Sequence, residues 1–446
     1  MLTATAEPTA PFGPNPTSLR GRFFERTLPA SSFVAFRVAF GLLIVAGQVR
    51  FIARGWVDEF YLAPAHHLTY PGFEWVRPLR QVWMYALVGG LALLGVAIAA
   101  GKRTRTAAAL FAVGFGYCEL IDAGLYLNHY WLLTLAALVL AVLPGPIDGR
   151  VAAVSVWALR AQLGAVYVFA GVAKLNSDWL LRAEPLQTWL AARTDRPIVG
   201  PWLDDPFAAF AFSWAGAAFD LTIVGWLLWR RSRPIAYAVL VAFHVATALL
   251  FQIGMFPWVM IALTPIFFAP DWPARFRTRQ AAHSYHSQDA PGSRQTSVGR
   301  PTIAVLATMV AFNVVLPLRH VATDGNVRWN DDGYVLSWRV MLTERASHVV
   351  FRVTDPSEGT TFEVGADYVL EDWQAAAATV RADLILTTAH LIANDLRPLL
   401  GDDVEVRADV FVAWNGRLHE RWIDPNVELA ALDRRSPAST YVLPTP

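Results

Sequence analysis

The sequence predicts a polytopic α-helical membrane protein of about nine spans, followed by a C-terminal extracytoplasmic α+β domain that is rich in β-strand. Two observations indicate the membrane part. Only 16% of the 446 residues are charged, whereas 55% are hydrophobic and 18 are Trp, and apolar runs long enough to cross a bilayer recur up to about residue 318. After Pro317 the composition becomes that of a soluble domain, which predicts the second part.

Charge and cysteine content exclude several classes of protein. A net charge of +1 gives no generally basic surface, so we expect no nucleic-acid partner. The single cysteine, Cys118, cannot form an intrachain disulfide, and we predict no metal site. Residues 1–30 are rich in Pro and Thr and lack an apolar core, so they predict a mobile cytoplasmic tail rather than a cleavable signal peptide.

The predicted transmembrane domain, residues 31–318, contains nine apolar runs that we interpret as spans. They are Phe33–Ile52, Val82–Ala100, Thr106–Leu120, Tyr130–Leu143, Val154–Val172, Phe207–Leu228, Ile235–Phe251, Phe256–Phe268 and Ile303–Leu316. The third, fourth, eighth and ninth runs are shorter than a usual span, so each could be tilted, re-entrant or shielded by its neighbours.

Positive charges gather on alternate loops, before the first run and after the second, sixth and eighth. Short cytoplasmic loops collect Lys and Arg, so nine crossings put the N-terminus in the cytoplasm and the C-terminal domain outside. Residues 270–300 carry Ser, Gln and Gly and read as a disordered cytoplasmic loop. Two histidines in this loop, His283 and His286, are too weak a pattern to predict a metal site.

The C-terminal domain, residues 319–446, alternates between strand and helix patterns. A helical spacing over Asp372–Leu396 places Leu384, Ile385, Ala389 and Ile392 on one side. Alternating residues predict strands at Tyr334–Leu342, Val349–Thr354, Thr361–Val364 and Val404–Trp414, and near Arg417–Ile423.

Lys174 is the most unusual residue of the membrane part. It ends the apolar stretch AVYVFAGVAKLNSDWL, just before a polar exit and Trp179. One interpretation is a lysine that snorkels to the membrane interface beside an anchoring tryptophan. The other is a catalytic base, because lysine is the cation that most readily loses its proton when buried.

The predicted topology brings further polar groups to the level of Lys174. His129 begins the fourth span on that side, and His320 leaves the ninth span there. Each histidine alone is typical of a hydrogen-bonded packing residue, whereas several titratable groups at one depth favour chemistry. With Asp122, Asn128 and Asp178 nearby in the chain, we expect an outward-facing pocket roofed by the C-terminal domain.

Several motifs resemble the vitamin K-dependent γ-glutamyl carboxylase family, including bacterial-type homologues that share its transmembrane domain. The resemblance covers about Phe23 to Leu432. The motifs, in chain order, are LNHYWLL, FAGVAKLNSDWL, FHVATALLFQIGMFPWVMIALTPIFFAPDWP, LRHVATDGNVRWNDDGYVLSWRVML and FVAWNGRLHERWIDP.

The resemblance implies an enzyme that oxidises reduced vitamin K, a phylloquinol or menaquinol, to its epoxide with O2 and uses the resulting base to carboxylate peptide Glu with CO2. It implies that Lys174 is the base that deprotonates the hydroquinone. His129, with Asn128 before it, matches the family histidine associated with oxygenation, and all three residues would bind the quinol. A neutral lysine in a dry pocket is chemically able to accept a phenolic proton.

The resemblance also implies residues that bind the glutamate substrate. His320, Trp329, Tyr334 and Trp338 match positions near that glutamate, and Arg193 matches an arginine that helps to hold its carboxylate. The implied partners are a Glu-containing peptide or protein and membrane lipid. Two alternatives stay open: a naphthoquinol epoxidase without peptide carboxylation, and a non-catalytic quinone- or lipid-binding membrane protein.

Overall fold

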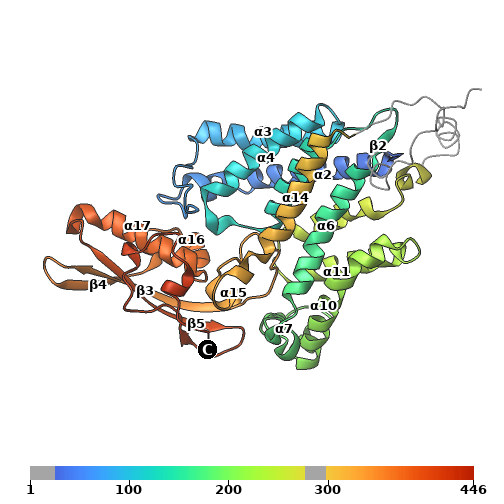
Figure 1. Ribbon diagram of the computed structural model, residues 1–446. Coiled ribbons are helices and arrows are strands. Elements are labelled where there is room, and N and C mark those ends of the chain that lie inside the picture. Colours follow the sequence, from blue (N-terminus) through green and yellow to red (C-terminus); the bar gives the residue numbers. More distant parts are fainter. Residues whose placement is uncertain (1–25, 277–297, 446) are drawn as a thin grey trace, which may run out of the picture.

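The protein consists of a helical bundle and a C-terminal sheet-containing domain at one end of it (Figure 1). This computed structural model describes residues 26–276 and 298–445. Residues 1–25 of the predicted tail, and residues 277–297 of the predicted loop with His283 and His286, lie outside the described residues. Each part has its own apolar core, one within the bundle and one between the sheet and helices of the C-terminal domain.

Each of the nine apolar runs falls on a helix of the bundle. These helices are α2 (Ser31–Ala53), α3 (Gln81–Ala100), α4 (Thr104–Ile121), α5 (Asn128–Val142), α6 (Ala153–Ala173), α10 (Pro206–Leu228), α11 (Arg233–Leu250), α12 (Phe256–Leu263, continued by η3, Thr264–Phe267) and α14 (Arg300–Leu318). Among the described residues, six are long and apolar enough to span a membrane: α2, α3, α6, α10, α11 and α14. The bundle is therefore a membrane domain, and the count of nine crossings stays a prediction.

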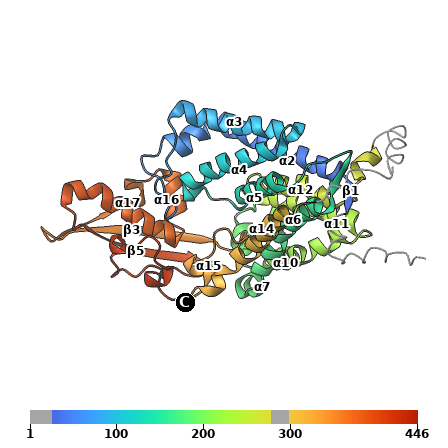
Figure 2. The ribbon, with the colours of Figure 1, turned by 45° about the horizontal axis from the view of Figure 1, so that its top comes forward.

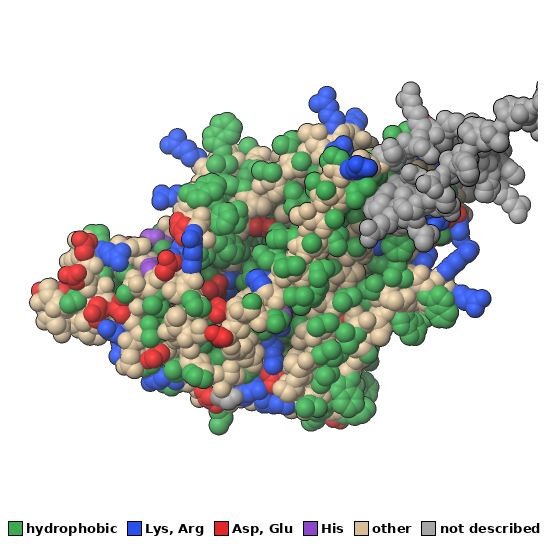
Figure 3. Space-filling model, viewed as in Figure 1, with side chains coloured by type: hydrophobic (Ala, Val, Ile, Leu, Met, Phe, Trp, Pro, Cys, Tyr) green, Lys and Arg blue, Asp and Glu red, His purple; other side chains and the backbone are tan. Residues whose placement is uncertain are grey.

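Small residues let the first two long helices pack closely. A Cβ atom added to Gly41 of α2 would lie 2.4 Å from the carbonyl oxygen of Gly95 in α3, and one added to Gly95 would lie 2.8 Å from Ile44. Close backbone contact through small residues is how helices gain packing energy in lipid, where burial of apolar surface contributes little. Figure 3 shows the apolar surface over the bundle, with most of the acidic side chains on the C-terminal domain.

Short elements connect the long helices. Strand β1 (Thr27–Pro29) pairs antiparallel with β2 (Arg150–Ala152), so these residues of the predicted tail are ordered. The remaining short elements are η1 (Asp58–Leu62), η2 (Ala123–Leu125), α7 (Ser177–Arg182), α8 (Leu186–Ala191), α9 (Gly200–Leu203), η4 (Trp272–Phe276), η5 (Arg319–Ala322) and α15 (Val327–Asn330). Helix α6 ends at Ala173, so Lys174 lies just beyond its last turn.

The C-terminal domain is a four-stranded antiparallel sheet with two helices packed beside it (Figure 2). The strand order is β4-β3-β5-β6, and side chains of the central strand β5 alternate between more and less buried, as a sheet with one covered face requires. Its elements are β3 (Arg345–Asp355), β4 (Thr360–Val364), η6 (Ala366–Tyr368), α16 (Asp372–Ala378), α17 (Ala382–Leu400), β5 (Glu405–Trp414), β6 (Glu420–Arg421), η7 (Leu429–Ala431) and η8 (Ala438–Thr440). Three predicted strands are thereby confirmed, and the four apolar residues predicted on one side of the helix are buried in α17.

Three predictions for this domain need correction. The predicted strand Tyr334–Leu342 is wrong, because the backbone enters the left-handed region at Leu336, Trp338 and Met341, which interrupts extended pairing. The predicted helix Asp372–Leu396 is divided in two, since Arg381 is extended between α16 and α17. Of the predicted strand near Arg417–Ile423, two residues are paired in β6.

Candidate functional site

Lys174 is buried against a carboxylate. Its Nζ atom lies 2.8 Å from Oδ2 of Asp220 in α10, and both side chains are 7% exposed. Gly171 makes this pairing possible, because a Cβ atom there would lie 2.8 Å from the backbone nitrogen of Leu221 and would push α6 away from α10. The snorkelling interpretation is therefore wrong: the ammonium points into the protein and is paired, with the Trp179 ring 5.1 Å from Nζ.

The Lys174–Asp220 pair lines an apolar cavity that we call the lysine pocket, formed by Tyr167, Lys174, Trp179, Asp220, His244 and Phe256 with aliphatic neighbours. The hydroxyl of Tyr167 and Nε2 of His244 lie 2.9 Å apart. The other ring nitrogen of His244, Nδ1, is buried and has no hydrogen-bond partner among residues 26–276 and 298–445. The Lys174–Asp220 pair and His244 therefore line one cavity, whose volume is about 70 Å³.

A second cavity continues from the lysine pocket. This arginine pocket, of about 250 Å³, is formed by Trp189, Ala192, Arg193 and Gln252, and it shares Phe251, Ile253 and Met341 with the lysine pocket. Lys174 and Arg193 thus line neighbouring cavities with a common wall. The indole N–H of Trp189 donates a hydrogen bond to Glu344, which attaches this region to the start of the C-terminal domain.

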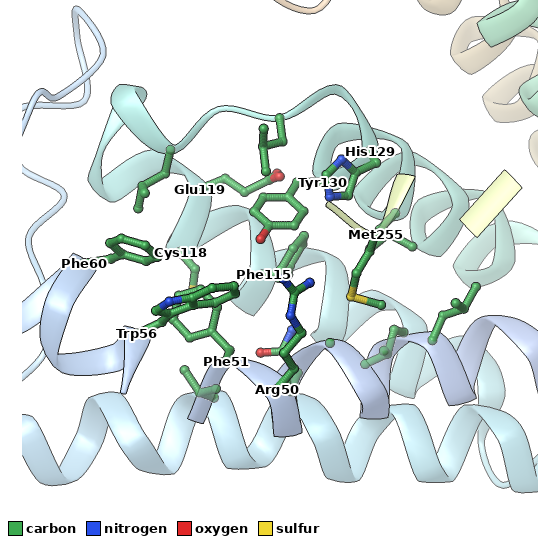
Figure 4. A pocket seen from close by; sticks show the side chains of 18 of the residues that line it. Arg50, Phe51, Trp56, Phe60, Phe115, Cys118, Glu119, His129, Tyr130 and Met255 are labelled. Atoms are coloured by element: carbon green, nitrogen blue, oxygen red, sulfur yellow. The ribbon is translucent and has the colours of Figure 1, made fainter. Parts of the chain in front are cut away.

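His129 lines a different and larger space. We call this space the aromatic cavity, after its walls Phe51, Trp56, Phe60, Tyr61, Phe115 and Tyr130, and its volume is about 280 Å³ (Figure 4). The ring of Phe256, which lines the lysine pocket, is 6.2 Å from the His129 ring and 5.9 Å from the His244 ring. The structure therefore does not bring His129 and Lys174 into one cavity.

Asn128 is bound to its own loop. Its Oδ1 atom accepts a hydrogen bond of 3.0 Å from the hydroxyl of Tyr126, and that hydroxyl accepts one from the backbone nitrogen of Leu336. Asn128 does not line the lysine, arginine or aromatic cavities. Asn128 therefore connects the loop before α5 to residues 331–343.

Of the five residues predicted to bind glutamate, Arg193 lines the arginine pocket, and the other four do not line the lysine, arginine or aromatic cavities. Trp329 is 2% exposed in the core of the C-terminal domain, and its N–H donates to the carbonyl oxygen of Leu443. Trp338 is fully buried in the core of the bundle. His320 is half-buried, with Nδ1 2.8 Å from the carbonyl oxygen of Pro317. Burial raises the pKa of Tyr334 above its ordinary value, which keeps its phenol protonated.

The segment that contains Tyr334 and Trp338 nevertheless reaches the site. Val340 and Met341 line the lysine pocket, and Met341 also lines the arginine pocket. Residues 331–343 therefore run from the C-terminal domain into the wall shared by both pockets. A change at Tyr334 or Trp338 would act through the position of this segment.

The two carboxylates expected in the pocket instead hold the bundle and the C-terminal domain together. Asp178 lies 3.0 Å from Arg328 and 2.5 Å from Arg417. Burial acts to raise the pKa of Asp178, but the hydrogen bond and charge of Arg417, with help from Asn415 and Arg328, outweigh it and lower that pKa.

Asp122 makes the second connection between the two parts. Its Oδ2 atom accepts a hydrogen bond of 2.7 Å from Gln374 of α16 and lies 3.3 Å from Nδ1 of His67. The carboxylate is fully buried. Asp122 and Asp178 are therefore structural connections and do not line the cavities.

Sequence reasoning missed Asp220, His244 and Tyr167. A signal for Asp220 was present, because it is the one charged residue in the run Phe207–Leu228. A carboxylate within a membrane span is costly unless it is paired, so it indicates a functional or paired position. Within the described residues, no group of three or more His, Cys, Asp or Glu side chains is arranged to hold a metal ion.

Comparison with known protein families divides the chain in the same way as the structure. Residues 25–272 match the model of the HTTM domain. Residues 299–446 match the model of the vitamin K-dependent gamma-carboxylase, lumenal domain. No solved structure matches the chain.

Proposed function

The chain belongs to the vitamin K-dependent γ-carboxylase family, and from that premise we propose that it oxidises a naphthohydroquinone to its epoxide and carboxylates peptide glutamate. The observation that carries the proposal is the buried Lys174–Asp220 pair, which lines a pocket that adjoins the one containing Arg193. Bound reduced vitamin K, with O2, would supply the base strong enough to remove a γ-carbon proton, and CO2 would then add.

The lining of the lysine pocket fits a quinol ring. Aromatic and aliphatic walls suit its faces, and Lys174, Asp220 and His244 are the lining residues that could meet its hydroxyl groups. Because the cavity volume is about 70 Å³, wall side chains must move to admit the ring. Phe256 lines the lysine pocket and its ring is 6.2 Å from the His129 ring, so a role for His129 in oxygenation would require this part of the wall to move.

Lys174 and Asp220 act together as the proton acceptor. The pair is neutral overall, whether the shared proton lies on nitrogen or on oxygen. Accepting one phenolic proton makes the pair a cation, and the anion left on the ligand balances that charge within the same pocket. A dry, low-dielectric site strengthens this attraction between the protonated pair and the anion of the ligand.

Arg193 is assigned to the carboxylate of the glutamate substrate, because a guanidinium binds a carboxylate through two parallel hydrogen bonds. His320, Tyr334 and Trp338 would position residues 331–343 against that substrate, with Trp329 holding the domain beneath them. Asn128 would support the same segment through Tyr126. The assignment of Arg193 follows the resemblance of the motifs, whereas the other roles are inferred from the contacts of residues 331–343.

The proposed orientation puts the N-terminus in the cytoplasm and the C-terminal domain outside. Its support is that the Arg-rich turns before α4 and before α11 lie at the end of the bundle away from the C-terminal domain (Figures 1 and 2). Reporter fusions at Arg231 and after Pro444 should then report opposite sides of the membrane. Reports from the same side would contradict this orientation.

The function is tested with purified protein, reduced vitamin K, labelled bicarbonate and a short Glu peptide, by following epoxide and fixed label together. Both products are expected from the wild type, and neither from Lys174→Ala. Epoxide without fixed label, across varied Glu peptides, would favour the epoxidase alternative. Neither product, with the quinone still bound, would favour a non-catalytic binding protein.

A further inference from the structure

The aromatic cavity contains a guanidinium, that of Arg50, which pairs with no carboxylate of the described residues. Arg50, in the last turn of α2, lines this cavity and is only partly exposed. Within residues 26–276 and 298–445 its guanidinium forms no hydrogen bond or ion pair, and its Cζ atom lies 4.8 Å from the centre of the Trp56 ring. A guanidinium in an apolar surrounding is stabilised strongly by an anion, so the position is suited to an acidic ligand.

The other residues that line the cavity indicate that the rest of the ligand is apolar. Apart from Arg50, the walls are mostly aromatic and aliphatic side chains of α2, α3, α4 and α5. The volume of about 280 Å³ is at the lower end of ligand pockets, which run from about 300 to 1,000 Å³. This space suits one hydrocarbon chain and not the two chains of a phospholipid.

Glu119 is the one carboxylate among the described residues that line the aromatic cavity. This carboxylate also lines the cavity and accepts a hydrogen bond of 3.0 Å from the hydroxyl of Thr134. It forms no ion pair with Arg50, and in the view of Figure 4 the Tyr130 ring lies between the two side chains. Arg50 is the one Lys or Arg side chain among the described residues that line the cavity, so an acidic head would lie at the Arg50 end.

We propose that the aromatic cavity binds a single-chain amphiphile with a carboxylate head, such as a long-chain fatty acid, whose head pairs with Arg50 and whose chain lies among the aromatic rings. Two parallel hydrogen bonds from a guanidinium match a carboxylate in geometry and charge. The cavity also adjoins the C-terminal domain, since the Phe60 ring is 5.1 Å from the Trp373 ring of α16. Occupancy would therefore stabilise the contact between the two parts. The proposal does not depend on the proposed enzyme activity.

The test uses the full chain in nanodiscs of zwitterionic lipid. Oleate is compared with oleyl alcohol, which has the same chain and no charge, by thermal shift and by cross-linking with a photoreactive fatty acid. We expect oleate to stabilise the wild type in a saturable way, oleyl alcohol to have no such effect, and cross-links to map to α2, α4 and α5. Arg50→Gln should weaken the oleate response about tenfold or more, as the loss of a charge-assisted bidentate pair predicts.

Arg54 provides a matched control. It lies one turn further along the chain, is exposed, is 5.9 Å from the same Trp56 ring and does not line the cavity, so Arg54→Gln should keep the oleate response. If Arg50→Gln does not fold, Gly47→Leu is the second variant, because Gly47 lines the cavity and a larger side chain would fill it.

Three results would overturn the proposal. The first is an equal response to oleate and oleyl alcohol in the wild type. The second is an unchanged oleate response in both Arg50→Gln and Gly47→Leu. The third is protection of the cross-linked peptides by a reduced naphthoquinone to the same extent in the wild type and in Arg50→Gln, which would assign the cavity to the quinol.

Discussion

Replacing Asp220 by Asn tests the central feature of the candidate site. The substitution keeps the size of the side chain and removes its charge, so Lys174 loses a carboxylate 2.8 Å from its nitrogen. Breaking one partner of a buried ion pair costs about 3 to 5 kcal/mol, because the remaining charge is uncompensated. Both side chains are 7% exposed, so water cannot replace the lost partner.

Two readouts separate the structural role of the pair from its chemical role. Asp220→Asn and Lys174→Ala should each lower thermal stability, while the double variant should recover part of that loss because no unpaired charge remains. Epoxide formation should fall by about 10²- to 10⁴-fold in Asp220→Asn, the usual contribution of a positioned proton acceptor, and should not recover in the double variant.

The assay measures melting temperature and epoxide formation on the same detergent-solubilised preparations. Asp205→Asn is the matched control: Asp205 caps α10 at its exposed start, and Asn caps a helix about as well as Asp. Wild-type epoxide formation by Asp220→Asn would refute the role of the pair as the proton acceptor. A double variant no more stable than either single variant would refute the electrostatic argument.

Three further predictions concern packing, pH and substrate. Gly171→Val should separate α6 from α10 and abolish epoxide formation. Gly225→Ala is the control and should be active, because a Cβ atom added at Gly225 meets nothing within 4 Å. Equal activities of the two variants would contradict the packing argument. The pKa of Asp178 is lowered in the folded protein, so the ionised carboxylate stabilises the contact between the two parts above the unfolded pKa of about 3.9, and this stabilisation is lost as the pH falls through the folded pKa. Limited proteolysis should therefore detect a looser contact in the wild type below about pH 4. Asp178→Asn should show no such change with pH. Arg193→Gln should raise the KM for the Glu peptide and reduce label fixation more than epoxide formation; an equal loss of both would contradict its place at the peptide carboxylate.

The division of the chain into two parts, and the class of each part, could be predicted from the amino-acid sequence. Long apolar runs and a low charged fraction are sufficient for a membrane bundle, because lipid permits only chains that satisfy their own backbone hydrogen bonds. Alternating residues were likewise sufficient for β3, β4 and β5. The motifs around Lys174 and Trp338 indicated the family, which the family models confirm over both parts of the chain.

Only the tertiary structure decided which polar groups meet. Lys174 and Asp220 are far apart in sequence and come together where Gly171 lets two helices touch, a contact that no local pattern records. Asp122 and Asp178, which were also expected in the pocket, instead bind side chains of the C-terminal domain, Gln374 and Arg417. His129 lines a different cavity from Lys174, although the ring of Phe256 in the lysine pocket is 6.2 Å from the His129 ring. The ion pairs and the shapes of the cavities depend on how the helices pack against one another. The local sequence specifies only which side of each helix is apolar and which is polar.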